Sequence, residues 1–456
     1  MKHRTLIATV VLFAVFALLQ ACFAEVSAEE AAKLKTTLTP FGGERAGNKE
    51  GTIPAWDGGI TQAPAGYTSG DRRPNPFPGE KPLFSIDGKN MSKYEDKLAE
   101  ATKFMLKKYP GFRLDVYPTH RTGAAPQWIY DNIFKNATRA KTTNNGLTVT
   151  GAYGGIPFPI PKDGNEAIFN HLLAYRGTQY QMPFTNYVVT PEGKAVLASR
   201  AVDTVRQPYF LESGSLESFK GYYLQLRQIQ TAPPFKNGES ILTWDPVDQY
   251  GVGRSAWQYL TGQRRVRRAP SIGFDTPDFV SSGQDYFDEV YMYNGSIERY
   301  DWKLLGKKEM YIPYNCYEYY LAPKDSDVIG VGMQYLNPDK VRWELHRVWV
   351  VEATLAPGKR HVVAKRRFYL DEDSWYVILY DGWDGQGKLW RHTQGVPINL
   401  YELPATVPIA FCVHNLQTGG RDVNNQVTES NAQMVSEPYK PDSYYSPDDL
   451  ASTGVR

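Results

Sequence analysis

The sequence predicts an α+β protein that is built mainly of antiparallel β-sheet. Apolar and polar residues alternate over 339–391, which is the period of a strand with two different faces. From about Asn186 onward, short aromatic and β-branched stretches are separated by Pro, Asn and Gly, as between strands. Helical signals are confined to the chain before residue 186. A sheet covered by a few helices accounts for all three observations.

Residues 1–24 predict a secretory signal peptide. Lys2 and Arg4 precede an apolar run of 14 residues, Leu6 to Leu19, which is too short to span a bilayer. The stretch "LLQAC" resembles a bacterial lipobox, in which Cys22 becomes acylated, whereas cleavage after Ala24 or Ala28 removes that cysteine. Both outcomes stay open, and both predict a periplasmic protein, either free or anchored to the outer membrane as a lipoprotein.

Residues 25–185 are expected to wrap over the sheet and to add helices to the same domain. The stretch "TPFGGERAGNKEGTIPAWDGGI", residues 39–60, has many turn formers but also apolar residues that a disordered linker does not need. A helix is predicted from an N-cap at Ser92 to a stop at Pro110 and Gly111, and a second helix over 164–177.

Residues 186–428 are predicted to form the antiparallel sheet, and 429–456 a loosely packed polar tail. In the stretch 339–391, "APGK" and "DEDS" separate three long strands. Arg342, Glu344 and His346 share the polar face of the first strand.

The charge balance excludes a nucleic-acid-binding protein. The 51 Lys and Arg residues are matched by 49 Asp and Glu, whereas phosphate binding needs a basic surface. The stretch "QRRVRR", residues 263–268, is therefore a local cluster. On a strand, Arg264 and Arg268 share one face with Val266; they form either a solvated strand face or the rim of a cavity whose ligand carries an anionic head.

No catalytic residue, cofactor or metal site is predicted. No phosphate-binding loop, nucleophile elbow or Cys-x-x-Cys pair occurs, and no two histidines are spaced i, i+4, although distant residues can converge in the fold. Cys316 and Cys412 are the cysteines beyond the signal region. In an oxidising compartment they form either a disulfide or two buried thiols.

Five stretches carry a resemblance to a known family, and together they span nearly the whole chain from Ser27 to Thr428. They resemble a proteobacterial periplasmic family of unknown function that is grouped with the outer-membrane lipoprotein-sorting proteins LolA and LolB. The stretches are "TPFGGERAGNKEGTIPAWDGGI", "GAYGGIPFPIPKDGNEAIFNHLLAYRG", "GQRRVRRAPSIGFDTPD", "YNGSIERYDWKLLGKKEMYIPYN" and "KRRFYLDEDSWYVILYDGWDGQGKLWR".

The resemblance implies a curved, unclosed β-barrel with helices covering one mouth and an apolar cavity for acyl chains. It also implies partners among resistance-nodulation-division (RND) type exporters and outer-membrane proteins. A barrel that does not close leaves inward positions free for a hydrophobic ligand, unless its side chains pack into a filled core. The candidate lining residues are Trp343, Leu345, Trp349, Val351, Phe368 and Leu370.

The sequence therefore predicts a non-enzymatic periplasmic carrier or chaperone of a lipid or other hydrophobic molecule. Such a protein acts in lipid or lipoprotein sorting, or together with an exporter. An enzyme acting on envelope polysaccharide and a structural adaptor of an exporter complex are the alternatives.

Overall fold

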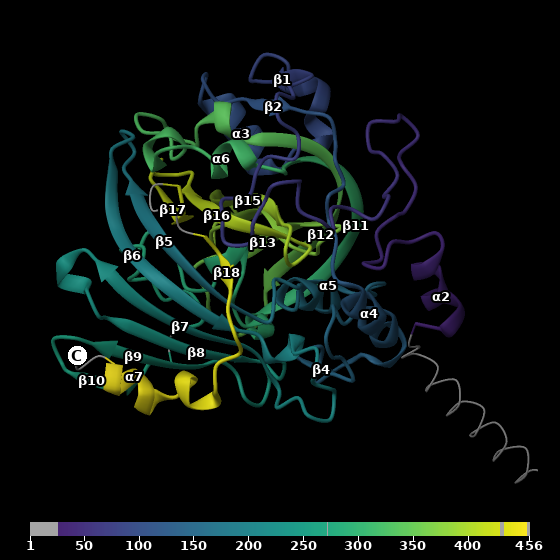
Figure 1. The fold of residues 1–456 in the computed structure, drawn as a ribbon. Coiled ribbons are helices and arrows are strands. Elements are labelled where there is room, and N and C mark those ends of the chain that lie inside the picture. The colour runs from purple at the N-terminus through teal and green to yellow at the C-terminus, as the bar shows by residue number, and fades with distance from the viewer. Residues whose placement is uncertain (1–25, 271, 429–432, 454–456) are drawn as a thin grey trace, which may run out of the picture.

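The computed structural model describes residues 26–270, 272–428 and 433–453. The predicted signal peptide and Cys22 lie outside these residues. A 16-stranded sheet dominates the fold, with the strand order β1-β2-β12-β13-β14-β15-β16-β17-β5-β6-β7-β8-β9-β10; β11 also pairs with β12, and β18 with β5 (Figure 1). The strands are β1 (Phe84–Ile86), β2 (Leu114–Val116), β5 (Gln179–Val189), β6 (Ala195–Arg206), β7 (Tyr222–Ala232), β8 (Ser240–Pro246), β9 (Ser255–Leu260), β10 (Arg265–Arg268), β11 (Tyr300–Pro313), β12 (Arg342–Leu355), β13 (Lys365–Asp371), β14 (Val377–Trp383), β15 (Leu389–Leu400), β16 (Ala405–Asn415), β17 (Arg421–Gln426) and β18 (Val435–Ser436).

The sheet is open, and its strand pairs are antiparallel except for the parallel pair of β12 with β2. This confirms the expected antiparallel class. Strands β12 to β17 follow one another as the predicted meander. The segment 25–185, which was expected to wrap over the sheet and to add helices, also contributes to the sheet itself. Strands β1 and β2 extend the β12 end, and β5 begins at Gln179. A separate hairpin joins β3 (Lys141–Thr143) to β4 (Thr148–Thr150).

The helices lie around the sheet, and none in the described part of the chain is long and apolar enough to cross a membrane. The helix predicted to start at Ser92 is interrupted, because Leu98 has an extended backbone between a 3-10 turn and α3. The α-helices are α2 (Ala28–Ala32), α3 (Glu100–Lys108), α4 (Gln127–Arg139), α5 (Gly164–Leu172), α6 (Tyr317–Tyr320) and α7 (Pro447–Thr453). The 3-10 helices are η2 (Lys33–Lys35), η3 (Met91–Lys97), η4 (Pro208–Phe210), η5 (Pro234–Lys236), η6 (Val290–Met292), η7 (Ile297–Arg299), η8 (Asp325–Asp327), η9 (Pro338–Lys340) and η10 (Asp442–Tyr445).

Helix α5 packs closely on the sheet. Its N-cap is Asp163, whose carboxylate accepts the Glu166 N–H. A Cβ at Gly164 would lie 2.5 Å from the Lys303 backbone nitrogen, so only glycine fits against β11 there. At the other end, His171 donates from Nε2 to the Tyr293 carbonyl and accepts the Val377 N–H at Nδ1. Burial lowers the pKa of His171 to about 3, which keeps this helix anchor neutral.

The described part of the C-terminal segment, residues 433–453, packs against the sheet, whereas loose packing was expected for 429–456. Tyr445 and Leu450 are buried against Leu242 and Tyr259, on β8 and β9. Arg227 forms an ion pair with Asp449. Figure 1 shows this segment crossing the sheet from β18 toward α7, beside β10. Tyr444 and Tyr445 supply apolar contacts that the polar composition of the segment does not indicate.

Candidate functional site

A cavity of about 60 Å³ lies on one face of the sheet, here called the inner face. The sheet supplies its floor, and residues 272–294, here called the cover segment, supply much of its roof. The lining residues are Phe184, Asn186, Asp203, Leu226, Gln228, Ile241, Thr243, Arg254, Ile272, Asp278, Val280, Phe287, Val290, Tyr291, Asn294, Phe411, Asn424 and Asn425.

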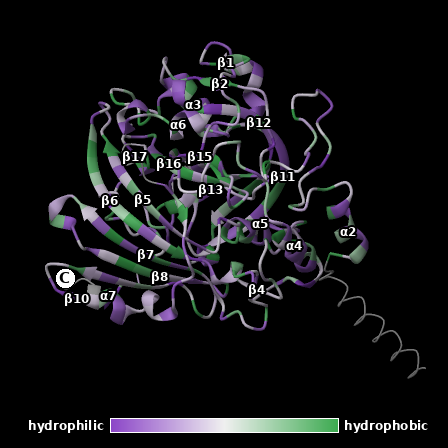
Figure 2. Ribbon diagram, in the orientation of Figure 1, coloured by the Kyte–Doolittle hydropathy of each residue, from purple (hydrophilic) through white to green (hydrophobic). Residues whose placement is uncertain are grey.

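Strand register directs the floor residues to the same face. Asp203 on β6 pairs with Gln228 on β7, which in turn pairs with Ile241 on β8. Directly paired residues point to the same side of a sheet, so the three side chains form one row. Phe411 and Asn424 form a similar pair between β16 and β17. Figure 2 shows both hydrophobic and hydrophilic residues along β5 to β8, as this mixed floor requires.

The cover segment has little regular structure and is anchored at its C-terminal end. Glu289 and Arg391 form a buried ion pair, and Asp288 accepts hydrogen bonds from Arg366 and His361 at 2.7 and 2.8 Å. Tyr291 and Met292 have positive φ values of 52° and 73°. Non-glycine residues rarely adopt this conformation, so the surrounding contacts have to hold it in place.

Asp203 is the carboxyl group that joins the floor to the cover segment. Its Oδ2 accepts the Tyr291 hydroxyl at 2.7 Å, and its Oδ1 accepts the Gln228 amide at 3.0 Å. Burial raises the pKa of Asp203 to about 6. Among the described residues, Gln228 Oε1 has no hydrogen-bond partner. A ligand that donates a hydrogen bond can satisfy this acceptor.

Three more buried carboxyl groups lie at or beside the cavity. Burial raises the pKa of Asp285 to about 7, and burial with the neighbouring carboxylates raises the pKa values of Asp278 and Asp422 well above the usual range. Asn424 donates to Asp285 at 3.0 Å. Asp203 and Asp285 therefore take up protons between mildly acidic and neutral pH, and perturbed groups of this kind are common at functional sites.

The cavity can bind a small group that is apolar on one side and donates hydrogen bonds on the other. Phenylalanine, leucine, isoleucine and valine side chains form the apolar wall, and the polar wall consists mainly of carboxyl and amide groups. The single arginine of the lining, Arg254, is occupied by Asp245 and by the Asn294 carbonyl. The site therefore disfavours an anionic group.

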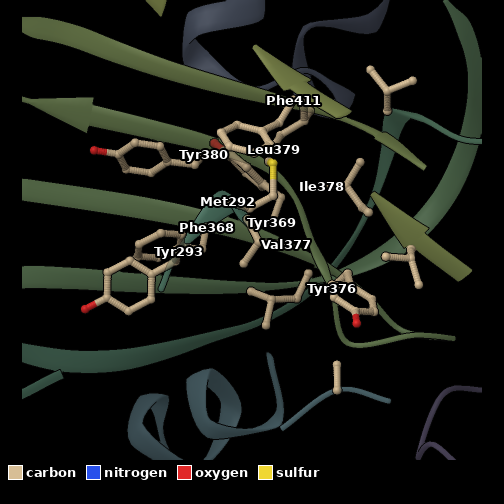
Figure 3. Packing of buried hydrophobic residues seen from close by; sticks show 14 of the residues in the cluster. Met292, Tyr293, Phe368, Tyr369, Tyr376, Val377, Ile378, Leu379, Tyr380 and Phe411 are labelled. Atoms are coloured by element: carbon tan, nitrogen blue, oxygen red, sulfur yellow. The ribbon is translucent and has the colours of Figure 1, made fainter. Parts of the chain in front are cut away.

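The six residues predicted to line a cavity are on the inner face but in another part of it. The register pairs Val351 with Phe368 and Trp349 with Leu370. Phe368 packs against Tyr293 and Tyr380, with ring centroids 5.2 and 5.1 Å apart (Figure 3). None of the six belongs to the lining of the described cavity: Trp343, Leu345, Trp349, Val351, Phe368 and Leu370. Their contact with a ligand stays a prediction.

The structure places the predicted rim arginines away from the cavity. Arg264 is not on a strand, because it ends the turn between β9 and β10 with a φ of 51°. Arg268 is exposed on β10, at the edge of the sheet. The side chain of Val266 on the same strand packs beside Tyr259, toward the C-terminal segment. The cluster therefore corresponds to the solvated strand face that the sequence left open.

Cys316 and Cys412 are free, buried thiols and do not form a disulfide. Burial raises the pKa of each thiol to about 12, so neither is a reactive thiolate. Of the two alternatives that the sequence left open, the structure has the separate thiols.

The cavity carboxyl groups were missed in the sequence because they come from distant, irregular segments. Asp203, Asp278 and Asp422 share no spacing that marks a site. The stretch "YFDEVY", residues 286–291, supplies Phe287, Val290 and Tyr291 to the lining, but its acidic residues Asp288 and Glu289 anchor the cover segment and do not line the cavity. Elsewhere among the described residues, the donor atoms of His346, Asp371 and Asp373 lie within 4.8 Å of one another, which is close enough for the three side chains to bind one metal ion.

The fold and the site define a protein with an open antiparallel sheet and a small cavity that contains protonatable carboxyl groups. The chain belongs to the family described as "Protein of unknown function (DUF1329)", whose model matches residues 85–451. This confirms the family that the sequence stretches indicated. The chain is also 37% identical to the uncharacterized protein PA3922 of Pseudomonas aeruginosa over 457 residues, which covers 95% of each chain.

Two solved structures are similar in fold. A DUF1329 family protein from Desulfovibrio piger is 13% identical, with a TM-score of 0.42, covering 62% of this chain and 95% of the other. The LolA superfamily protein NE2245 from Nitrosomonas europaea is 12% identical, with a TM-score of 0.38, covering 63% of this chain and 100% of the other.

Proposed function

We propose that this protein is a non-enzymatic carrier of a hydrophobic or amphiphilic molecule in the bacterial periplasm. The ligand binds on the inner face of the sheet, with its polar group in the cavity beside Asp203. In this proposal the sheet acts as an unclosed barrel with helices over one mouth. An exporter of the RND type and an outer-membrane protein are the proposed partners, and Cys22 is the proposed anchor if the lipobox is used.

The composition of the cavity wall is the observation that carries this proposal. Apolar side chains from the sheet and from the cover segment face carboxyl and amide groups whose charge is small at mildly acidic pH. A wall of this kind binds an uncharged or cationic amphiphile through apolar contact and a few hydrogen bonds. Each methylene group that the apolar wall removes from water contributes about 0.8 kcal/mol.

The ligand can enter only if the cover segment moves. A cavity of about 60 Å³ is smaller than the ~150 Å³ cavity that accommodates benzene, and drug-sized ligands occupy about 300–1,000 Å³. The ion pairs of Asp288 and Glu289 fix one end of the cover segment. Residues 272–287 lie before these anchors, and this part of the cover segment is proposed to lift and to enlarge the cavity. The Asp275–Arg299 ion pair and the Asn424–Asp285 hydrogen bond have to break in this movement.

A competing site lies on the opposite face of the same strands. A groove of about 410 Å³ is lined by residues that include Tyr153, Phe219, Tyr222, Trp244 and Tyr439. Thr243 lines the cavity and Trp244 lines the groove, because adjacent strand residues point to opposite faces. This pair gives a matched test of the two sites.

The test is mass spectrometry of organic extracts from gently purified protein. Wild type and Trp244→Phe are expected to release the same hydrophobic molecule, and Thr243→Phe, which fills the cavity, to release at least about tenfold less. Circular dichroism spectra confirm that the variants are folded. Empty wild-type protein contradicts the carrier proposal. A further variant, Trp244→Ala, removes the indole ring from the groove. Loss of the ligand in this variant, with retention in Thr243→Phe, moves the site to the groove.

An enzyme acting on envelope polysaccharide is the second candidate, because Asp203 and Asp278 both line the cavity and both have raised pKa values. Glycosidases use such carboxyl pairs as acid and base. The variants Asp203→Asn and Asp278→Asn distinguish the two functions. An enzyme loses turnover of a polysaccharide substrate, whereas a carrier still co-purifies with its hydrophobic ligand.

A further inference from the structure

On the sheet face opposite the cavity, His346 and Asp371 point acceptor atoms at each other. The Nδ1 atom of His346 lies 3.8 Å from Oδ1 of Asp371, which is too far for a hydrogen bond. Both side chains are fully buried. Among the described residues, Asp371 Oδ1 has no hydrogen-bond partner, although its other oxygen accepts from Ser374 and Tyr314. A buried carboxylate oxygen without a donor is costly, so something has to compensate it.

The hydrogen bond of Nε2 determines which ring nitrogen of His346 carries the proton. Nε2 lies 3.0 Å from Oε2 of Glu344. Glu344 also accepts hydrogen bonds from the His120 N–H, the Asn315 amide and the Arg342 guanidinium group. Glu344 is therefore an ionised acceptor, and Nε2 carries the proton that it accepts. Nδ1 of the neutral imidazole then presents a lone pair toward Asp371.

We propose that a divalent transition-metal ion, such as Zn²⁺, binds between His346 Nδ1, Asp371 Oδ1 and a carboxylate oxygen of Asp373. The donor atoms of the three residues lie within 4.8 Å of one another. Ligand bonds of about 2.0–2.2 Å at a tetrahedral angle place two ligand atoms roughly 3.4 Å apart. The 3.8 Å between His346 and Asp371 needs a small contraction, and the donor atoms of all three residues have to draw closer on binding. Glu344 acts as the carboxylate partner that orients a metal-bound histidine.

Asp373 is also bound by Arg121, with Nε and a terminal nitrogen each 2.7 Å from a carboxylate oxygen. This contact leaves room for a metal ion, because each carboxylate oxygen has two lone pairs and Arg121 uses one on each. The guanidinium group fixes the Asp373 carboxylate in place.

The surrounding ion-pair network has an excess of negative charge. It contains six carboxylates and four Lys or Arg side chains, so with neutral histidines the ionised network carries two uncompensated negative charges. Within the described residues of this network, Asp371 is the carboxylate that forms no ion pair with a lysine or an arginine. One divalent cation at Asp371 restores neutrality. The members are Glu44, Glu80, Glu344, Asp371, Glu372, Asp373, Arg121, Arg342, Arg347 and Lys307.

The test uses untagged protein that is refolded with Zn²⁺ and then dialysed, because the site is buried. Elemental analysis is expected to find one tightly held Zn²⁺ per chain, and thermal unfolding a midpoint several degrees above that of protein refolded with a chelator. In His346→Asn and Asp371→Asn, both the bound Zn²⁺ and the shift in midpoint are lost. His120→Asn removes another histidine near the network that is not a proposed ligand, and it keeps both.

Co²⁺ provides a readout of the ligands themselves. Wild-type protein refolded with Co²⁺ is expected to show visible absorption bands that are absent from His346→Asn. Wild-type protein that retains neither metal ion overturns the proposal. Metal retained at the wild-type level by folded Asp371→Asn overturns it as well, since the ion then binds elsewhere. Neither result depends on the carrier function.

Discussion

The Tyr291 hydroxyl donates a hydrogen bond to the Asp203 carboxylate, with 2.7 Å between the oxygen atoms. This bond joins the cover segment to the sheet above the cavity. Burial of Asp203 favours its protonated form, whereas the hydrogen bonds from Tyr291 and Gln228 and the charge of Arg176 favour its ionised form. Burial is the larger effect, so the closed site favours the protonated carboxyl group.

The stability of the protein is expected to fall as the pH rises from about 4 to about 6 through Asp203. Burial raises the pKa of this group from 3.8 to about 6, so the folded state binds its proton more tightly than the unfolded state does. The stabilisation is fully present below about pH 4 and is lost as the pH rises to about 6, at a total cost of about 3 kcal/mol. Asp278, Asp285 and Asp422 act in the same direction.

The variant Asp203→Asn is expected to remove this contribution. Its amide can still accept from Tyr291, and it can donate to the unpaired Gln228 Oε1 if that side chain flips. Urea unfolding at pH 4 should give similar free energies for variant and wild type, whereas at pH 7.5 the variant should be more stable by up to about 3 kcal/mol. The exposed Asp301→Asn serves as the control. A variant that is less stable at both pH values contradicts the expectation.

The pair of Glu289 and Arg391 is expected to hold the cover segment in place. Nε of Arg391 lies 3.0 Å from Oε1 of Glu289, and both side chains are almost fully buried. Arg391→Met leaves a buried carboxylate without its cation and should lower the free energy of unfolding by about 3–5 kcal/mol. The double variant Glu289→Gln, Arg391→Met should recover most of this loss, because no unpaired charge remains.

A matched control for this pair is the ion pair of Arg367 and Glu352, which is partly exposed with a distance of 2.7 Å. Arg367→Met should cost about 1 kcal/mol or less, since exposed pairs contribute little. Amide hydrogen exchange locates the effect: only Arg391→Met should speed exchange in residues 272–294. Uniformly faster exchange over the whole sheet means that the pair stabilises the fold in general and not the cover segment.

The period-two pattern predicted the strand faces correctly but not which of them is buried. Trp343 and Phe368 do share a face, as their spacing indicated. Glu344 and His346 on the other face are equally buried, because residues 119–123 lie over them and the His120 N–H donates to Glu344. Alternation identifies the two sides of a strand, but a distant segment decides whether the polar side meets water.

The cavity could not be predicted because its roof has no sequence period. Asp278 and Asp285 belong to turns of the cover segment, and they meet Asn424 and Asp203 only through the tertiary fold. The residues of β7 and β8 alternate between the two faces of the sheet, but this alternation does not indicate which face a loop covers. The C-terminal segment shows the same limit, since Leu450 is buried within a stretch of polar composition.

Both cysteines are expected to behave as inert buried thiols. Cys316 packs beneath β15, where its N–H bonds to the Pro397 carbonyl, and Cys412 lies within β16. Their pKa values of about 12 leave almost no thiolate at neutral pH, and burial excludes the reagent. For the chain that begins at residue 25, Ellman's reagent should therefore find no reactive thiol in the native state and two thiols after unfolding in guanidinium, without any reductant. If the unfolded chain releases thiols only after reduction, the two cysteines are bonded, and the segments carrying them must approach more closely than the structure has them.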